Sequence, residues 1–92
     1  MIIALDYDDT YTADPILWGK FIVLAEKLGH RVVCVTCRRD TDENREECKI
    51  ELLPTHAHYF TGLSPKRWFM EQRGVKVDIW IDDMPETIKE GR

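Results

Sequence analysis

Two short apolar segments of this chain each run directly into a group of acidic residues. The first segment is residues 1–5 and the second is residues 77–81. The acids that follow them are Asp6, Asp8, Asp9, Asp82 and Asp83. Short apolar runs are typical of buried strands. Because ligands of parallel sheets bind outside the carboxyl ends of the strands, where the strand order reverses, we expect these acids to converge on one site.

Carboxylates that lie close together repel one another, so such a cluster either stays partly protonated or holds a cation. Oxygen ligands alone favour a hard cation, and Mg²⁺ is the cation we expect here.

Strands and helices alternate along the sequence. We expect strands at the two acid-ended segments, at residues 31–36 and, more weakly, at residues 56–60. We expect helices over residues 14–28, 40–53 and 64–73, from the N-cap, proline and glycine signals around them. This alternation predicts an α/β fold with a parallel sheet. The expected strand order is 3-2-1-4, which would place Asp6 beside Asp82.

Apolar spacing predicts which helix faces pack. In the first helix a stripe repeats at helical spacing, formed by Leu17, Phe21, Leu24 and Leu28. The second helix is acidic, and only Cys48 and Leu52 share an apolar face. The tail from Met84 to Arg92 has room for one helical turn or frays.

Length and composition limit the class of protein. The 92 residues form one expected domain, residues 1–92, with 43% hydrophobic residues and a net charge of −4. That charge argues against general nucleic-acid affinity, which needs a basic field. No segment resembles a signal peptide or a membrane span, so we expect a protein that does not contact membranes. The three cysteines lack the number and spacing of a disulfide framework, so we expect a cytoplasmic location.

Two further residues extend the acid cluster. Thr36 ends the second strand on the same sheet edge, where its hydroxyl serves either a ligand or the nearby backbone. Lys66 lies in the first turn of the third helix, where a cation opposes the helix dipole. Lys66 is therefore either a solvated lysine or one compensated by an anion or by the acids.

In order, the chain presents Asp6-x-Asp8-x-Thr10, Thr36, Lys66 and Asp82-Asp83. This series resembles the haloacid dehalogenase-like (HAD) superfamily, which consists mostly of phosphohydrolases, over nearly the whole chain. Receiver domains of response regulators also combine acids, Thr and Lys, but their phosphoacceptor follows a middle strand, which here ends without an acid.

The resemblance implies a role for each residue. Asp6 would be the nucleophile that forms an aspartyl-phosphate, and Asp8 the general acid and base, with Thr10 fixing its loop. Thr36 and Lys66 would hold the phosphoryl oxygens. Mg²⁺ would bind Asp6, the backbone carbonyl of Asp8, and Asp82 with or without Asp83.

Some positions depart from that pattern. Asp9 stands where many members have glycine, but Asp is tolerated at positive φ. Glu86 is the nearest acid beyond Asp82 and Asp83, and the fifth strand common in the superfamily is missing.

A narrower resemblance begins at Thr36. The segment Thr36-Cys37-Arg38, followed by an acidic helix, is similar to the Thr-Gly-Arg segment of polynucleotide-kinase-type phosphatase domains and some nucleotidases. It implies that Arg38 contacts a substrate phosphate or anchors the loop; a solvated arginine is an equally good interpretation.

Other residues have simpler interpretations. Cys34 and Cys37 have C-x-x-C spacing, but strand alternation points them to opposite faces, so Cys34 is expected to be a core thiol. His56 and His58 lack a third metal ligand and are expected at the surface or sheet edge. The tryptophans are expected in the core, with Trp18 also available to line a pocket or an interface.

The links where HAD proteins carry a cap domain are short here. We therefore expect a capless Mg²⁺-dependent phosphatase acting on nucleotides or nucleic-acid ends, which would cover the site themselves. A homo-oligomer in which a neighbouring subunit covers the site, and a catalytically weak HAD-fold binding or assembly module, are the alternatives.

Overall fold

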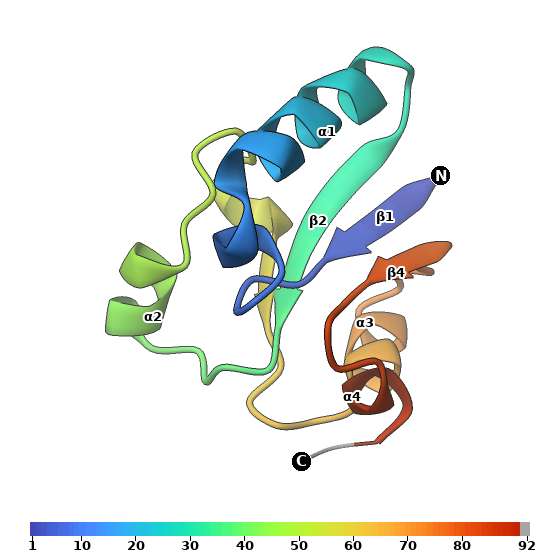
Figure 1. Cartoon of the computed structure of the whole chain (residues 1–92). Coiled ribbons are helices and arrows are strands. Elements are labelled where there is room, and N and C mark those ends of the chain that lie inside the picture. Colours follow the sequence, from blue (N-terminus) through green and yellow to red (C-terminus); the bar gives the residue numbers. More distant parts are fainter. Residues whose placement is uncertain (91–92) are drawn as a thin grey trace.

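The computed structural model of the protein describes residues 1–90, and its four strands form one parallel sheet (Figure 1). The strands are β1 (Ile2–Leu5), β2 (Arg31–Thr36), β3 (His58–Phe60) and β4 (Ile79–Ile81). Their order is β3-β2-β1-β4, and all three pairings are parallel. The predicted α/β class, parallel sheet and strand order are confirmed.

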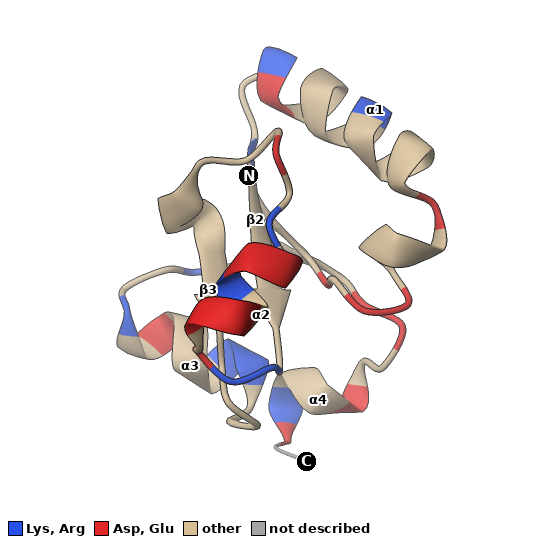
Figure 2. Ribbon diagram, turned by 90° about the vertical axis from the view of Figure 1, so that its left-hand side faces the viewer, with Lys and Arg blue, Asp and Glu red and all other residues tan. Residues whose placement is uncertain are grey.

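Helices cover both sides of this sheet. They are α1 (Pro15–Lys27), α2 (Asp42–Glu47), α3 (Lys66–Gln72) and α4 (Glu86–Lys89), with single 3₁₀ turns at Tyr11–Ala13 and Thr55–Ala57. α1 and α3 lie on opposite sides of the sheet (Figures 1 and 2). This follows from right-handed crossovers, because the chain moves one way across the sheet from β1 to β2 and the other way from β3 to β4.

β1 lies at the centre of the core. Its register aligns Leu5 with Cys34 of β2 and with Ile81 of β4, so β1 and β4 end at the same level and β2 continues two residues further, to Thr36. Both central strands consist almost entirely of buried β-branched and apolar residues, as expected for a sheet covered on both faces. Cys34 is a buried core thiol, as predicted, and the three cysteines are unpaired.

α1 begins where the sequence predicts, because the Asp14 carboxylate accepts a hydrogen bond from the Leu17 amide at 3.0 Å and Pro15 occupies the first turn. Of the predicted packing stripe, only Phe21 packs against the core. Leu17, Leu24 and Leu28 are 53%, 57% and 67% exposed, whereas Ile22 and Ala25 are buried. Apolar residues cover more than half of the circumference of α1, so periodicity alone could not decide which side meets the sheet.

Other expectations also need correction. α2 ends at Glu47, well before Pro54; Cys48 caps it and is buried, but Leu52 is half exposed. His58 lies on β3, an edge strand, which is one of its two predicted positions, but its side chain is buried. Trp68 is half exposed rather than in the core. The tail forms one helical turn, α4, and the expectation for residues 91–92 lies outside the described residues.

The helices are short. The longest, α1, has 13 residues, and over residues 1–90 no helix has the length and apolar character needed to cross a bilayer.

Candidate active site

The acids that follow β1 and β4 meet at the carboxyl edge of the sheet, as predicted. The Asp6 amide donates to the Ile81 carbonyl at 2.9 Å, which fixes the two strand ends side by side. Asp6, Asp82 and Asp83 each offer a carboxylate oxygen, and these oxygens lie within 4.8 Å of one another. The acidic loops after β1 and β4 lie next to each other in Figure 2. This acidic triad could hold a metal ion.

Lys66 lies within this triad rather than in solvent. It is the first residue of α3 and only 1% exposed. Its Nζ donates to Asp6 Oδ1 at 2.9 Å and to Asp82 Oδ2 at 2.5 Å. The acid cluster therefore compensates the buried cation, which was one of the two interpretations of Lys66.

The Thr10 hydroxyl connects the two acidic loops. Its Oγ1 lies 3.2 Å from Asp6 Oδ2 and 3.3 Å from Asp83 Oδ1, and it accepts a hydrogen bond from the Asp83 amide at 3.2 Å. A hydroxyl has one proton, so it donates to one of the two carboxylates at a time. The turn before it places Asp9 at φ +60°, the conformation for which Asp is tolerated.

The charges within the site shift the pKa values of its groups. Burial, together with a hydrogen bond to Asp83, raises the pKa of Asp6 to about 6, although the charge of Lys66 opposes this shift. For Lys66, burial favours the neutral amine, but the hydrogen bond that its ammonium donates to Asp82 and the charge of Asp6 outweigh burial and raise the lysine pKa. The cluster therefore contains a charged lysine and more negative than positive charge at neutral pH, which favours a further cation.

Asp8 and Arg38 form a two-pronged ion pair beside the triad. Arg38 Nε donates to Asp8 Oδ2 at 2.8 Å, and Nη2 donates to Oδ1 at 2.7 Å. These hydrogen bonds, with that of Glu47, raise the pKa of Arg38 further above its ordinary value. The guanidinium thus contacts a carboxylate of this chain; its contact with a substrate phosphate stays a prediction.

Thr36 ends β2 at the expected edge and is buried. Its hydroxyl accepts a hydrogen bond from the Arg38 amide at 3.4 Å, so in this structure it serves the nearby backbone.

A cavity of about 310 Å³ opens over the site. It is lined by Asp6, Asp8, Asp9, Cys37, Lys66, Asp82, Asp83, Met84 and Thr87. The sequence did not identify Cys37, Met84 or Thr87 as part of the site. Cys37 directly follows the strand-end residue Thr36, and this position is a sequence signal for the site. Met84, before α4, and Thr87, within it, carry no such signal.

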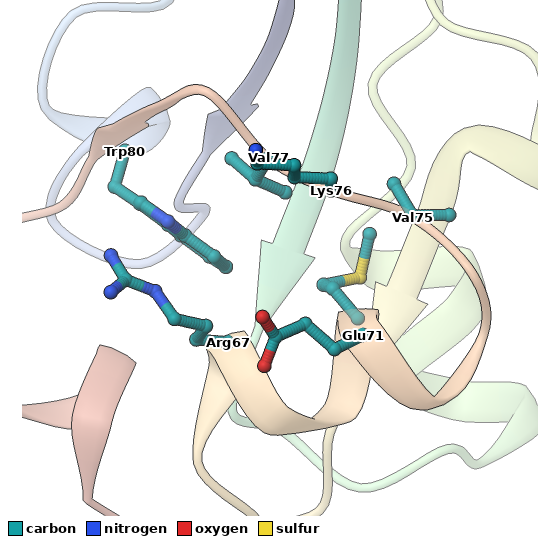
Figure 3. A pocket seen from close by; sticks show the side chains of 7 residues that line it. Arg67, Glu71, Val75, Lys76, Val77 and Trp80 are labelled. Carbon is teal, nitrogen blue, oxygen red and sulfur yellow. The ribbon is translucent and has the colours of Figure 1, made fainter.

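Two other cavities lie near β4. One, of about 240 Å³, is lined by Arg67, Glu71, Trp80 and neighbouring residues, and Figure 3 shows these side chains around it. It shares no lining residue with the acidic cavity. The other is a shallow hollow between α1 and the Asp82–Asp83 loop. Trp18 lines this hollow, in agreement with the expectation that it lines a pocket or an interface.

Comparison with known proteins finds no matching family model, no matching curated protein and no matching solved structure.

Proposed function

We propose that this protein is a Mg²⁺-dependent phosphomonoesterase of the haloacid dehalogenase-like type. The observation that carries the proposal is the buried Lys66 held between Asp6 and Asp82, with Asp83 and Thr10 completing the cluster. Buried ionic groups are costly to maintain for stability alone, and perturbed acids in a cavity are typical of functional sites.

The donor set fits the proposed cofactor. Asp6, Asp82 and Asp83 supply only oxygen ligands, which suit Mg²⁺ and suit softer metals less well. When bound, Mg²⁺ would supply positive charge that offsets the repulsion between an anionic substrate and an acidic cavity.

The chain's own residues would perform the chemistry in two steps. An Asp6 carboxylate oxygen attacks the phosphorus atom and forms an aspartyl-phosphate, while Asp8 gives a proton to the departing alcohol oxygen. Asp8 then takes a proton from water, whose oxygen attacks the phosphorus and releases inorganic phosphate and free Asp6. The Lys66 ammonium, at 2.9 Å from Asp6, stabilises the transferring phosphoryl oxygens.

A screen of phosphomonoesters tests this proposal. Purified protein with millimolar Mg²⁺ is assayed against nucleotides, sugar phosphates and 5′- or 3′-phosphorylated oligonucleotides, with Asp6→Asn as the inactive control. We expect phosphate release that requires Mg²⁺ and is absent in Asp6→Asn. Release by both proteins, or by neither, would contradict the proposal.

The exposed side of α1 favours a second candidate function, a binding or assembly module. Ile16, Val23 and Leu24 are 74%, 55% and 57% exposed and line one open hollow with Leu52. Sedimentation equilibrium of the wild type and of Ile16→Glu/Val23→Glu distinguishes the two candidates. A module that self-associates through α1 without phosphatase activity would support this second function.

A further inference from the structure

We propose that Arg38 is a positioning residue for Asp8, and that it acts on the reaction through this carboxylate rather than by binding the substrate phosphate. The inference rests on the proposed function and deepens it, because it concerns the general acid and base of that site.

Both oxygens of Asp8 bind one edge of the guanidinium. The two contacts, 2.8 Å to Nε and 2.7 Å to Nη2, define a bidentate pair in which the carboxylate plane is fixed relative to the guanidinium. The Asp8 side chain is 44% exposed, and a bidentate pair is the contact that sets the plane of an exposed carboxylate. The pair therefore limits Asp8 to one orientation at the edge of the acidic cavity.

The opposite edge of the guanidinium is held by α2. Nη1 donates to Asn44 Oδ1 at 3.1 Å and forms an ion pair with Glu47 Oε2 at 3.0 Å. The Tyr7 ring lies 5.8 Å from the guanidinium carbon, and the Tyr7 hydroxyl donates to the Glu47 carbonyl at 2.9 Å. Contacts with α2 and with the Tyr7 ring therefore hold the guanidinium in place independently of its contact with Asp8.

The main chain of Arg38 is fixed as well. Its amide donates to the Thr36 hydroxyl at 3.4 Å, and its carbonyl accepts from the Gly62 amide at 3.1 Å. The position of the Asp8 carboxylate, on the loop after β1, therefore depends on three other segments: the loop after β2, the loop after β3, and α2.

The hydrogen-bond capacity of arginine distinguishes the two roles. Of its five N–H groups, those on Nε and Nη2 donate to Asp8 and one on Nη1 donates to Asn44, while Nη1 also forms the ion pair with Glu47. A substrate phosphate bound bidentately by Arg38 would have to displace Asp8 or the α2 residues. A role through Asp8 needs a smaller exchange: the Asp8 oxygen that carries the proton releases one guanidinium N–H, while the other oxygen keeps its hydrogen bond.

This arrangement assigns a structural role to the acidic helix α2. Glu47 and Asn44 are on the side of α2 that holds Arg38, and the Thr41 hydroxyl caps the helix by accepting from the Asn44 amide at 3.1 Å. The short helix is a support for the guanidinium.

A double-mutant cycle on two substrates tests this inference. Steady-state kinetics are measured for wild type, Arg38→Ala, Asp8→Asn and the double variant, with p-nitrophenyl phosphate and with an alkyl phosphate. An alkoxide needs protonation to depart, whereas p-nitrophenolate does not, so only the alkyl ester depends strongly on the general acid.

We expect Arg38→Ala to lower kcat on the alkyl ester by roughly 10- to 100-fold, the range for a misplaced catalytic group, with a smaller loss on p-nitrophenyl phosphate and little change in KM. In the Asp8→Asn background, Arg38→Ala should cause no further loss, because the two residues act as one unit. Additive losses, or a rise in KM shared by both substrates, would overturn the inference.

Two milder variants keep the test independent of folding. Arg38→Lys retains the charge but not the two-pronged geometry, and should resemble Arg38→Ala; wild-type kcat in Arg38→Lys would contradict positioning. Glu47→Gln weakens only the far edge of the guanidinium and should give an intermediate loss on the alkyl ester; a change on p-nitrophenyl phosphate alone would contradict it.

Arg45→Ala is the matched control. Arg45 forms the same kind of two-pronged pair in this region, with Asp40 at 2.5 and 2.9 Å, but away from the cavity. Its kcat should equal that of the wild type, and an equal loss in Arg45→Ala would make Arg38 a structural residue only. An inactive wild type, or an active Asp6→Asn, would refute the proposed function and this inference with it; additivity in an active enzyme would refute this inference alone.

Discussion

Replacing Lys66 by methionine should destabilise the protein severely, and more at high pH than at low pH. Methionine fills a similar volume but leaves Asp6 and Asp82 facing each other without a cation. The side chains of Lys66, Asp6 and Asp82 are 2%, 7% and 3% exposed, so solvent screens their interactions little. Removing one partner of a buried ion pair costs about 3–5 kcal/mol.

That cost is a large share of the total stability, which is about 5–15 kcal/mol for a domain. For a chain of this length, each kcal/mol lowers the melting temperature by about 4–8 °C, so we expect a drop of roughly 12 °C or more at pH 8.

The pH dependence has a definite sign. The pKa of Asp6 is raised to about 6 from an ordinary value of 3.8, so its ionisation disfavours the folded state as pH rises through about 6. Lys66 opposes this shift, and its removal raises the Asp6 pKa further. The stability difference between wild type and Lys66→Met should therefore shrink between pH 8 and pH 5.

Urea denaturation at pH 5 and pH 8 measures both effects. Lys49→Met is the matched control, because Lys49 is half exposed and lies 3.8 Å from Glu51, a contact worth about 0–1 kcal/mol. Equal losses in the two variants, or a loss in Lys66→Met that does not change with pH, would refute the reasoning.

Three further predictions concern the metal, the nucleophile and a buried histidine. Mg²⁺ should raise the melting temperature more at pH 7.5 than at pH 5, because protons compete with the metal for Asp6. The Asp82→Ala substitution should reduce this rise more than Glu86→Ala does. A rise that Asp82→Ala does not change would contradict the metal site. Asp6→Asn should raise the metal-free melting temperature, since it relieves repulsion, while reducing turnover below a tenth of wild type; a tenth or more argues against the nucleophile. His58 accepts from the Ile50 amide at 2.9 Å, and burial lowers its pKa below 6.5, so it should contribute stability that is lost as pH falls below about 6.5. Urea titrations of His58→Gln should lack this component, and those of His56→Gln, an exposed control, should keep it.

Much of the site could be predicted because strand ends in a parallel sheet share one edge. Once the runs before Asp6 and Asp82 are taken as strands and the order as 3-2-1-4, the two acids must be neighbours, and Lys66 at the start of α3 follows. These inferences need only the topology of the chain.

The remainder depends on packing that periodicity does not determine. α1 is apolar around most of its surface, so the side that meets the sheet is set by its connections to β1 and β2. His58 is buried because its ring replaces backbone hydrogen-bond partners, accepting from Ile50 and lying 3.0 Å from the Pro54 carbonyl. The Arg38–Asp8 pair joins residues 30 positions apart through a loop conformation that no local pattern encodes.

The most direct test of the central claim is to trap the covalent intermediate on Asp6. Protein turning over a phosphomonoester with Mg²⁺ is quenched in acid and treated with borohydride, which reduces an aspartyl-phosphate to homoserine. Mass spectrometry of the N-terminal peptide should then find homoserine at position 6 in the wild type and none in Asp6→Asn. Turnover with no homoserine at position 6, or with homoserine at Asp8, Asp82 or Asp83 instead, would contradict the account.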